Sequence, residues 1–195
     1  MIDVEQAKAI VLSKCESFSR SGERFAIQSC VLSERGDYWI VRANSEDFVL
    51  RGIQERQYVG VNAYLVNTSS GEVEAIGSRQ NVQQHLNDRY DLAAAGDGYY
   101  VLACAIDPED KAAIVHLKRR LGCTLQRAVH LTSAEFRGWL YGKRSALLHA
   151  QALLEREGIS VVIQLMEETG CAVQIDHPLP HWDALKSALS GAGAG

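Results

Sequence analysis

The sequence of 195 residues lacks any apolar run that approaches membrane-spanning length, and it lacks a basic leader followed by an apolar stretch. A transmembrane helix needs about 20 consecutive apolar residues, and a secretory leader needs a positively charged start and an apolar centre. Here the first residues enter directly into an amphipathic pattern that contains Asp3, Glu5 and Lys8. We therefore expect no membrane association, no export and a cytoplasmic location.

Disulfide-forming patterns are also missing. The five cysteines are odd in number, widely spaced and without a C-x-x-C pair. This usage is typical of reduced thiols in a reducing compartment, and it argues against a disulfide framework.

Neither half of the chain has a large excess of one charge sign. Residues 1–93 hold ten Lys/Arg against thirteen Asp/Glu, and residues 94–195 hold ten against eleven, so the net charge of -4 is evenly spread. A nucleic-acid-binding surface requires a basic face. The one basic run, Lys118–Arg120, is typical of a solvated helix face. We expect no nucleic-acid partner.

Common catalytic motifs are absent: there is no G-x-G-x-x-G, no G-x-x-x-x-G-K-S/T and no G-x-S-x-G. Cys123 lies close to Arg119 and Arg120, which would lower the pKa of its thiol, but no partner motif accompanies it. His177 and His181 have the spacing of a metal-ligating pair, but the prolines between them forbid a helix. We expect no catalytic, cofactor-binding or metal-binding residue and no enzyme; a site around Cys123 or His177 is the alternative.

The first half of the sequence predicts an antiparallel sheet with flanking helices. Apolar residues recur at helical spacing after Asp3, which is a suitable N-cap. Alternating apolar residues indicate strands, and Gly71 can supply the positive φ of a hairpin turn. The expected elements are a helix over 3–18, strands over 25–32 and 38–43, a short helix capped by Ser45 or irregular structure over 45–52, a hairpin over 62–77 and a helix over 80–90.

A domain boundary is expected at residues 92–98, where Ala-Ala-Ala-Gly-Asp-Gly interrupts the periodicity. It separates a domain over 1–93 from a domain over 98–190, and residues 191–195 form a flexible tail. The expected elements of the second domain are a strand over 99–106, a helix from Asp107-Pro108 to Leu121, a helix over 124–133, a strand over 135–141, a helix capped by Ser145 and ended by Gly158, strands over 160–166 and 173–175, and a helix over 182–189. The fold class is α+β with two small domains.

Residues 64–91, YLVNTSSGEVEAIGSRQNVQQHLNDRYD, resemble the signature of the YrhB-like family, which is also described as the immunity protein 35 family of bacterial polymorphic toxin systems. The signature consists of a strand, a hairpin turn, a short segment that leaves the hairpin, and a helix. These correspond to Tyr64–Asn67, Ser70–Glu72, Gly77–Ser78 and Asn81–Tyr90. The family also opens with an N-terminal helix, so the resemblance covers about the first 93 residues. It implies a small α+β domain that neutralises a cognate toxin by direct binding, and a chaperone-like role has also been attached to the family.

Residues 99–166 resemble the C-terminal domain of the ribosomal stalk protein, which implies a compact βααβαβ fold. Cys123-Thr124 stands where that family has glycines, and Gln126-Arg127 stands where it has the Lys-Glu pair of its factor-binding face. The resemblance therefore implies a shared fold and not a role in translation. The matching positions are Lys111, Leu125, Ala128, Ala150, Leu153, Leu154, Gly158 and Val161.

Trp139, Tyr141, Lys143 and Arg144 form a run in which the two aromatic residues share one face of a strand. Aromatic residues and arginine are the usual anchors of protein interfaces, so these four are the candidate partner-binding residues. The alternative is that both aromatic side chains pack in the core of the second domain.

These observations predict a bacterial immunity protein that neutralises a cognate polymorphic toxin, of a contact-dependent or type VI secreted system, by direct binding. The expected partner is the toxin domain. The alternative is a chaperone-like cytoplasmic module that binds many proteins weakly.

Overall fold

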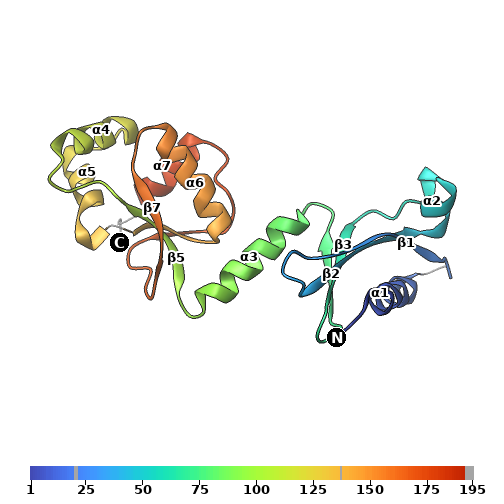
Figure 1. Ribbon diagram of the computed structural model, residues 1–195. Helices are drawn as coiled ribbons and strands as arrows, with labels where there is room; N and C mark the ends of the chain where they lie inside the picture. The colour runs from blue at the N-terminus through green and yellow to red at the C-terminus, as the bar shows by residue number, and fades with distance from the viewer. Residues whose placement is uncertain (20–21, 137, 192–195) are drawn as a thin grey trace. The chain divides into compact units, whose positions relative to one another are not determined.

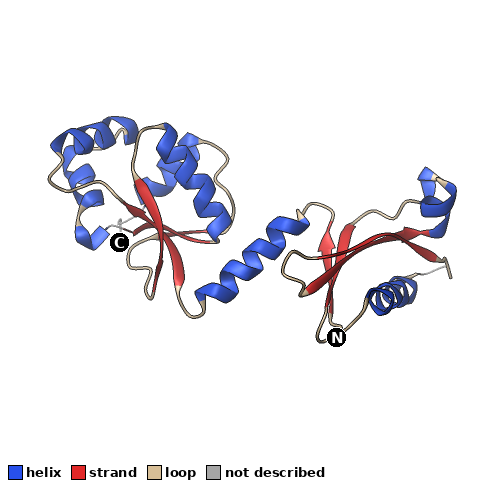
Figure 2. Ribbon diagram, viewed as in Figure 1, coloured by secondary structure: helices blue, strands red, loops and turns tan. Residues whose placement is uncertain are grey.

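A computed structural model describes residues 1–19, 22–136 and 138–191 and shows an α+β protein. The chain divides into two compact units, Met1–His85 (unit 1) and Leu86–Gly195 (unit 2). Each unit contains a four-stranded sheet and its own helices (Figures 1 and 2). The division falls inside helix α3, Val82–Ala95, which runs through part of the segment where we expected the domain boundary.

Unit 1 is built on two consecutive hairpins. The sheet order β1-β2-β3-β4 follows the chain, and every neighbouring pair is antiparallel. This confirms the antiparallel sheet expected from the alternating patterns. The elements are α1 (Val4–Phe18), β1 (Phe25–Leu32), β2 (Tyr38–Ser45), α2 (Glu46–Arg51), the 3-10 helix η1 (Gln54–Arg56), β3 (Val61–Asn67) and β4 (Val73–Gly77).

Helix α1 begins where Asp3 caps it. The Gln6 backbone N–H donates to the Asp3 carboxylate at 2.8 Å, and the Asp3 N–H donates to the Gln6 side chain at 2.9 Å, which is a capping box. The predicted apolar stripe is buried at Ala7, Val11 and Cys15, which pack against strand residues of the sheet. Helix α1 thus covers one face of the unit 1 sheet.

The turn of the signature hairpin forms as its residues predict. The Asn67 side-chain oxygen accepts the backbone N–H groups of Ser69 and Ser70, both at 2.9 Å. Gly71 then takes φ +73°, a conformation that residues with a Cβ rarely adopt. Helix α3 follows, with Asn81 accepting the Gln84 N–H at 3.0 Å.

Unit 2 has the sheet order β7-β5-β6-β8, in which β6 and β8 are parallel and the other pairs antiparallel. One apolar cluster joins side chains of these strands to side chains of four helices, with Leu117, Trp139 and Leu147 fully buried in it. The elements are β5 (Tyr99–Cys104), α4 (Lys111–Leu121), α5 (Leu125–Thr132), the 3-10 helix η2 (Ala134–Phe136), β6 (Gly138–Gly142), α6 (Arg144–Arg156), β7 (Val161–Met166), β8 (Val173–Ile175) and α7 (Trp182–Gly191).

Two helix starts differ from the prediction. Helix α4 begins at Lys111 and not at Pro108, because Asp110 is the residue whose carboxylate accepts the Ala113 N–H, while Asp107 accepts the Glu109 N–H in a preceding turn. Helix α6 begins at Arg144, and its N-cap is Lys143 without a side-chain hydrogen bond, so Ser145 is not the cap.

The ends of three further segments also differ. Residues 134–136 form a 3-10 turn, so that β6 begins only at Gly138, and residue 137 lies outside the described residues. Helix α7 continues to Gly191, while the rest of the predicted flexible tail, 192–195, also lies outside them. Strand β5 ends at Cys104. Among the helices that the structure describes, none has the length and apolar character that crossing a bilayer requires.

Candidate protein-binding site

Trp139, the first of the predicted partner-binding residues, is fully enclosed in unit 2. Its side chain belongs to the apolar cluster, and its indole N–H donates to the Leu131 carbonyl at 2.9 Å. Strand β6 lies between β5 and β8, so both of its edges are occupied. The alternative of core packing therefore applies to Trp139, which presents no surface to a partner.

The other three residues of the run make contacts within unit 2. Tyr141 stacks edge-to-face on Tyr99 with ring centroids 6.0 Å apart, and its hydroxyl donates to Gln174 at 3.1 Å. The remaining two residues are exposed cations that pair with carboxylates of α3: Lys143 with Asp88 at 3.8 Å, and Arg144 with Asp91 at 3.6 Å. Ion pairs this long and exposed contribute at most about 1 kcal/mol. They leave both cations accessible to a partner.

Cys123 is not an activated thiol. Burial raises its pKa, and the opposing effects of Arg127 and Lys118 are smaller. The expectation that neighbouring arginines lower this pKa is therefore wrong, because desolvation of a half-buried thiolate outweighs nearby exposed cations.

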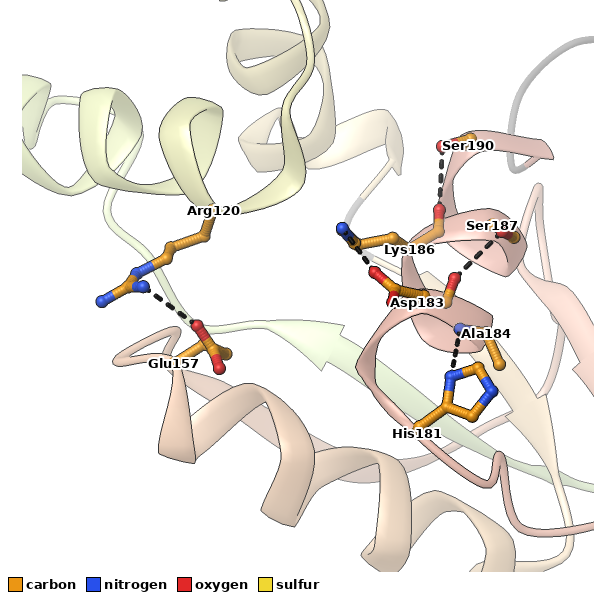
Figure 3. A network of polar contacts seen from close by, with 8 residues as sticks. All are labelled: Arg120, Glu157, His181, Asp183, Ala184, Lys186, Ser187 and Ser190. Carbon is orange, nitrogen blue, oxygen red and sulfur yellow. Dashed lines mark hydrogen bonds and ion pairs between the residues drawn. The ribbon is translucent and has the colours of Figure 1, made fainter.

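Of the two histidines in the 177–181 loop, His181 caps a helix. The His181 Nδ1 accepts the Ala184 backbone N–H at 3.2 Å at the start of α7, so this nitrogen carries no proton there (Figure 3). Lys186 and Asp183 form an ion pair at 2.7 Å on the same helix, and Lys186 lowers the pKa of the Asp183 carboxyl. Within residues 1–19, 22–136 and 138–191, no three His, Cys, Asp or Glu side chains are grouped to hold a metal ion.

The basic run on α4 is exposed, as expected for a solvated helix face. Figure 3 shows its last residue, Arg120, reaching Glu157 at the end of α6, with an N–O distance of 3.2 Å. His116 reaches the same place, because its Nε2 lies 2.7 Å from the Glu157 carbonyl oxygen. These contacts fasten α4 to α6 and leave most of the positive charge in solvent.

A segment that the sequence did not single out has the character of a binding surface. Every residue from Leu50 to Val61, here called the 50–61 segment, is exposed. Val59 is 85% exposed and Leu50 is 69% exposed, far more than apolar side chains in packed loops. The apolar residues of the segment are Leu50, Ile53, Tyr58, Val59 and Val61.

The 50–61 segment is held in place by two buried polar residues at the end of β2. Asn44 donates to the Tyr58 carbonyl at 3.0 Å and accepts the Tyr58 N–H at 2.8 Å. Ser45 is fully buried, and its hydroxyl both donates to the Arg56 carbonyl and accepts the Phe48 N–H, which caps α2. The backbone of Arg56 and Tyr58, in the middle of the exposed segment, is therefore held by hydrogen bonds.

Such a loop suits recognition of a protein surface. Apolar side chains on a pre-ordered backbone bind a partner without the entropic cost of ordering a flexible loop. Tyr58, which belongs to the segment, is itself held in place. Its ring rests against Phe25 with ring centroids 5.1 Å apart, and its hydroxyl donates to Glu23 at 2.8 Å. The sequence signal for this site is weak: apolar residues without helix or strand periodicity, in a stretch that contains Gly52 and Gly60.

Comparison of the chain with protein-family models, with curated proteins and with solved structures finds no match.

Proposed function

We propose that this protein is an immunity protein that neutralises a cognate bacterial toxin of a polymorphic toxin system by binding it directly. The observation that carries the proposal is the resemblance of residues 64–91 to the YrhB-like signature. The matching residues form a hairpin with Gly71 in its turn, followed by α3, and α1 precedes them in the chain. This element order supports the proposal.

The 50–61 segment is the surface of unit 1 that we assign to the toxin. Its exposed apolar residues supply the centre of an interface, and the charged Glu55 and Arg56 between them are exposed and suited to a polar rim. A one-to-one complex of standard size buries roughly 1,200–2,000 Å² in total. Binding on this scale either covers the toxin active site or holds the toxin in an inactive form.

A genetic experiment tests the function. The product of the adjacent reading frame is expressed in cells with and without this gene. We expect growth arrest without the gene and normal growth with it, and we expect the two purified proteins to form a stoichiometric complex. Equal growth in both strains contradicts the proposal.

A pair of variants tests the surface. Val59→Asp places a charge at the most exposed apolar residue of the 50–61 segment, and we expect it to weaken toxin binding at least about tenfold. Val129→Asp is the matched control, because Val129 is 50% exposed on α5 of unit 2. Calorimetry measures both affinities. Equal affinities of the two variants would assign the toxin to another surface.

A chaperone-like module is the second candidate, since exposed apolar residues also bind unfolded chains. It predicts that the protein suppresses aggregation of several unrelated denatured proteins, with Val59→Asp reducing the effect. Tight binding to a single partner, without any suppression of aggregation, would support the immunity protein over the chaperone-like module.

A further inference from the structure

Strand β7 forms one edge of the unit 2 sheet. Its backbone groups alternate in direction, and the Ser160 carbonyl accepts the Ala105 N–H at 3.0 Å on the β5 side. The β5–β7 register runs from Tyr99–Met166 to Cys104–Val161 without a bulge. The N–H and C=O groups of Val161, Ile163 and Leu165 therefore point away from β5, toward the open edge.

The four sheet edges differ in their protection against pairing with another strand. Edge strands of monomeric proteins are blocked by bulges, charges, proline or short length. Strand β1 contains an irregularity between Ile27 and Ser29, β4 carries Glu74, and β8 has three residues. Strand β7, VVIQLM, has none of these devices. It is the one described edge that is regular, uncharged and six residues long.

The same strand exposes apolar side chains. Leu165 is 52% exposed, and Met166 and Val162 are nearly 40% exposed. Leu165 and Met166 border an open hollow of about 590 Å³, which Ala95 and Gly98 also line. An uncharged edge with exposed apolar residues is a template for an added strand.

We propose that β7 pairs antiparallel with β7 of a second copy of this chain, so that two unit 2 sheets join into one sheet of eight strands. Only outward-pointing residues can exchange hydrogen bonds across the new edge. The register that uses all of them places Ile163 opposite Ile163 of the second copy and Val161 opposite Leu165. A twofold axis passes between the two Ile163 residues.

Identical strands fit this edge for two reasons. The partner must be uncharged over the paired length, because a charge beside Ile163 would be desolvated without a counter-ion, and β7 itself meets that condition. In the proposed register Glu167 faces Ile159 of the other copy and not another carboxylate, so no like charges meet. The inference does not depend on the proposed toxin binding, which uses unit 1.

Removing one outward N–H tests the pairing. Leu165→Pro removes a donor at two symmetric places while leaving the hydrogen bonds to β5 intact, because proline is tolerated where the N–H of an edge strand faces outward. We expect sedimentation equilibrium of the full chain to show a dimer, and we expect Leu165→Pro to raise its dissociation constant at least about tenfold. Leu165→Ala, which keeps the N–H, is the control and should change the constant less than Leu165→Pro does.

A monomer at all concentrations up to the millimolar range, or a dimer that Leu165→Pro and Leu165→Ala weaken equally, would overturn the proposal. Circular dichroism of both variants verifies that the chain is folded.

A cross-linking experiment tests the register. With the exposed Cys171 replaced by serine, Ile163→Cys places two thiols across the axis, where paired Cα atoms are about 5.5 Å apart and a disulfide fits. Leu165→Cys is the control, because in this register it lies about four residues, or roughly 13 Å, from its own copy. We expect a reducible dimer with Ile163→Cys alone. A stronger cross-link from the more exposed Leu165→Cys contradicts this register.

Discussion

Each unit places a tryptophan of a sheet strand so that its indole N–H donates to a backbone carbonyl at 2.9 Å: Trp39 to Ile2 in unit 1, and Trp139 to Leu131 in unit 2. The two hydrogen bonds are alike, but the surroundings differ. Trp39 is half-buried at the margin of the cluster under α1, whereas Trp139 is fully enclosed among strands and helices. The comparison shows that the same polar contact can fasten a chain terminus in one unit and the centre of a core in the other.

The two units also differ in how many helices pack on their sheets. In unit 1 the cluster under α1 takes its buried residues from α1, β2 and β3, while in unit 2 four helices contribute to one cluster. In the unit 1 sheet, strands that are consecutive in sequence pair with each other. In the unit 2 sheet, the paired strands are not consecutive in sequence, apart from β5 and β6. We therefore expect substitutions in unit 2 to cost more stability than matched substitutions in unit 1.

The largest effect is expected from the two tryptophans. Trp139→Ala should lower the free energy of unfolding of unit 2 by about 3–5 kcal/mol, because it leaves a large cavity and an unpaired Leu131 carbonyl. Trp39→Ala should cost unit 1 about half as much, since part of the ring already contacts solvent. Urea unfolding followed by circular dichroism measures both. Equal losses of unfolding free energy in the two variants would show that the difference in burial of the two tryptophans does not determine their contributions to stability.

A smaller difference is expected between two glycines. Gly142 has φ +147°, and a Cβ added there would overlap the carbonyl oxygen of Ile175 where β6 lies beside β8. Gly142→Ala should cost about 2–3 kcal/mol and detach β8. Gly71→Ala should cost about 1–2 kcal/mol, because its added Cβ meets only the flexible side chains of Ile2, at 3.4 Å, and Ile10, at 3.7 Å. A larger loss for Gly71→Ala in thermal unfolding would contradict this ranking.

Most elements of both units follow from local signals in the sequence. The stripe after Asp3 predicts α1, the Asn67–Gly71 turn predicts the second hairpin, and Gly122 ends α4 with φ +68° as expected. These signals depend on neighbours in the chain, so they are readable without the fold. The same reasoning failed at Asp107, where two aspartates three residues apart both suit a cap and the structure uses the second, whose carboxylate accepts the Ala113 N–H.

The candidate site was less predictable, because exposure depends on contacts between distant elements. The sequence leaves both a surface position and core packing open for Trp139, and the structure packs its side chain among strands and helices that are distant in sequence. Nothing within residues 138–142 indicates which of the two applies. The 50–61 segment is not recognisable from the sequence for a different reason. Its backbone is ordered by Asn44 and Ser45, two residues of a strand, and a sequence pattern does not show which loop a strand end will hold.

The smallest expected difference between the units is in how much stability each loses at alkaline pH. In unit 1, burial raises the pKa of the Cys15 thiol and of the Tyr64 phenol beside it, and burial also raises the pKa of Cys30. In unit 2, burial raises the pKa of Cys123. Groups with a raised pKa keep their protons in the folded state, so their stabilisation is complete below the ordinary pKa, which is 9.0 for the cysteines and 10.0 for Tyr64, and is lost as the pH rises above it.

We therefore expect unit 1 to lose more thermal stability than unit 2 between pH 8 and pH 10. The fluorescence of Trp39 in a Trp139→Phe, Trp182→Phe variant reports on unit 1, and a Trp39→Phe variant reports on unit 2. Cys15→Ala should reduce the pH dependence of unit 1, whereas the exposed control Cys171→Ala should not. A greater alkaline loss in unit 2 would mean that the buried thiol and phenol under α1 are not what couples folding to protonation.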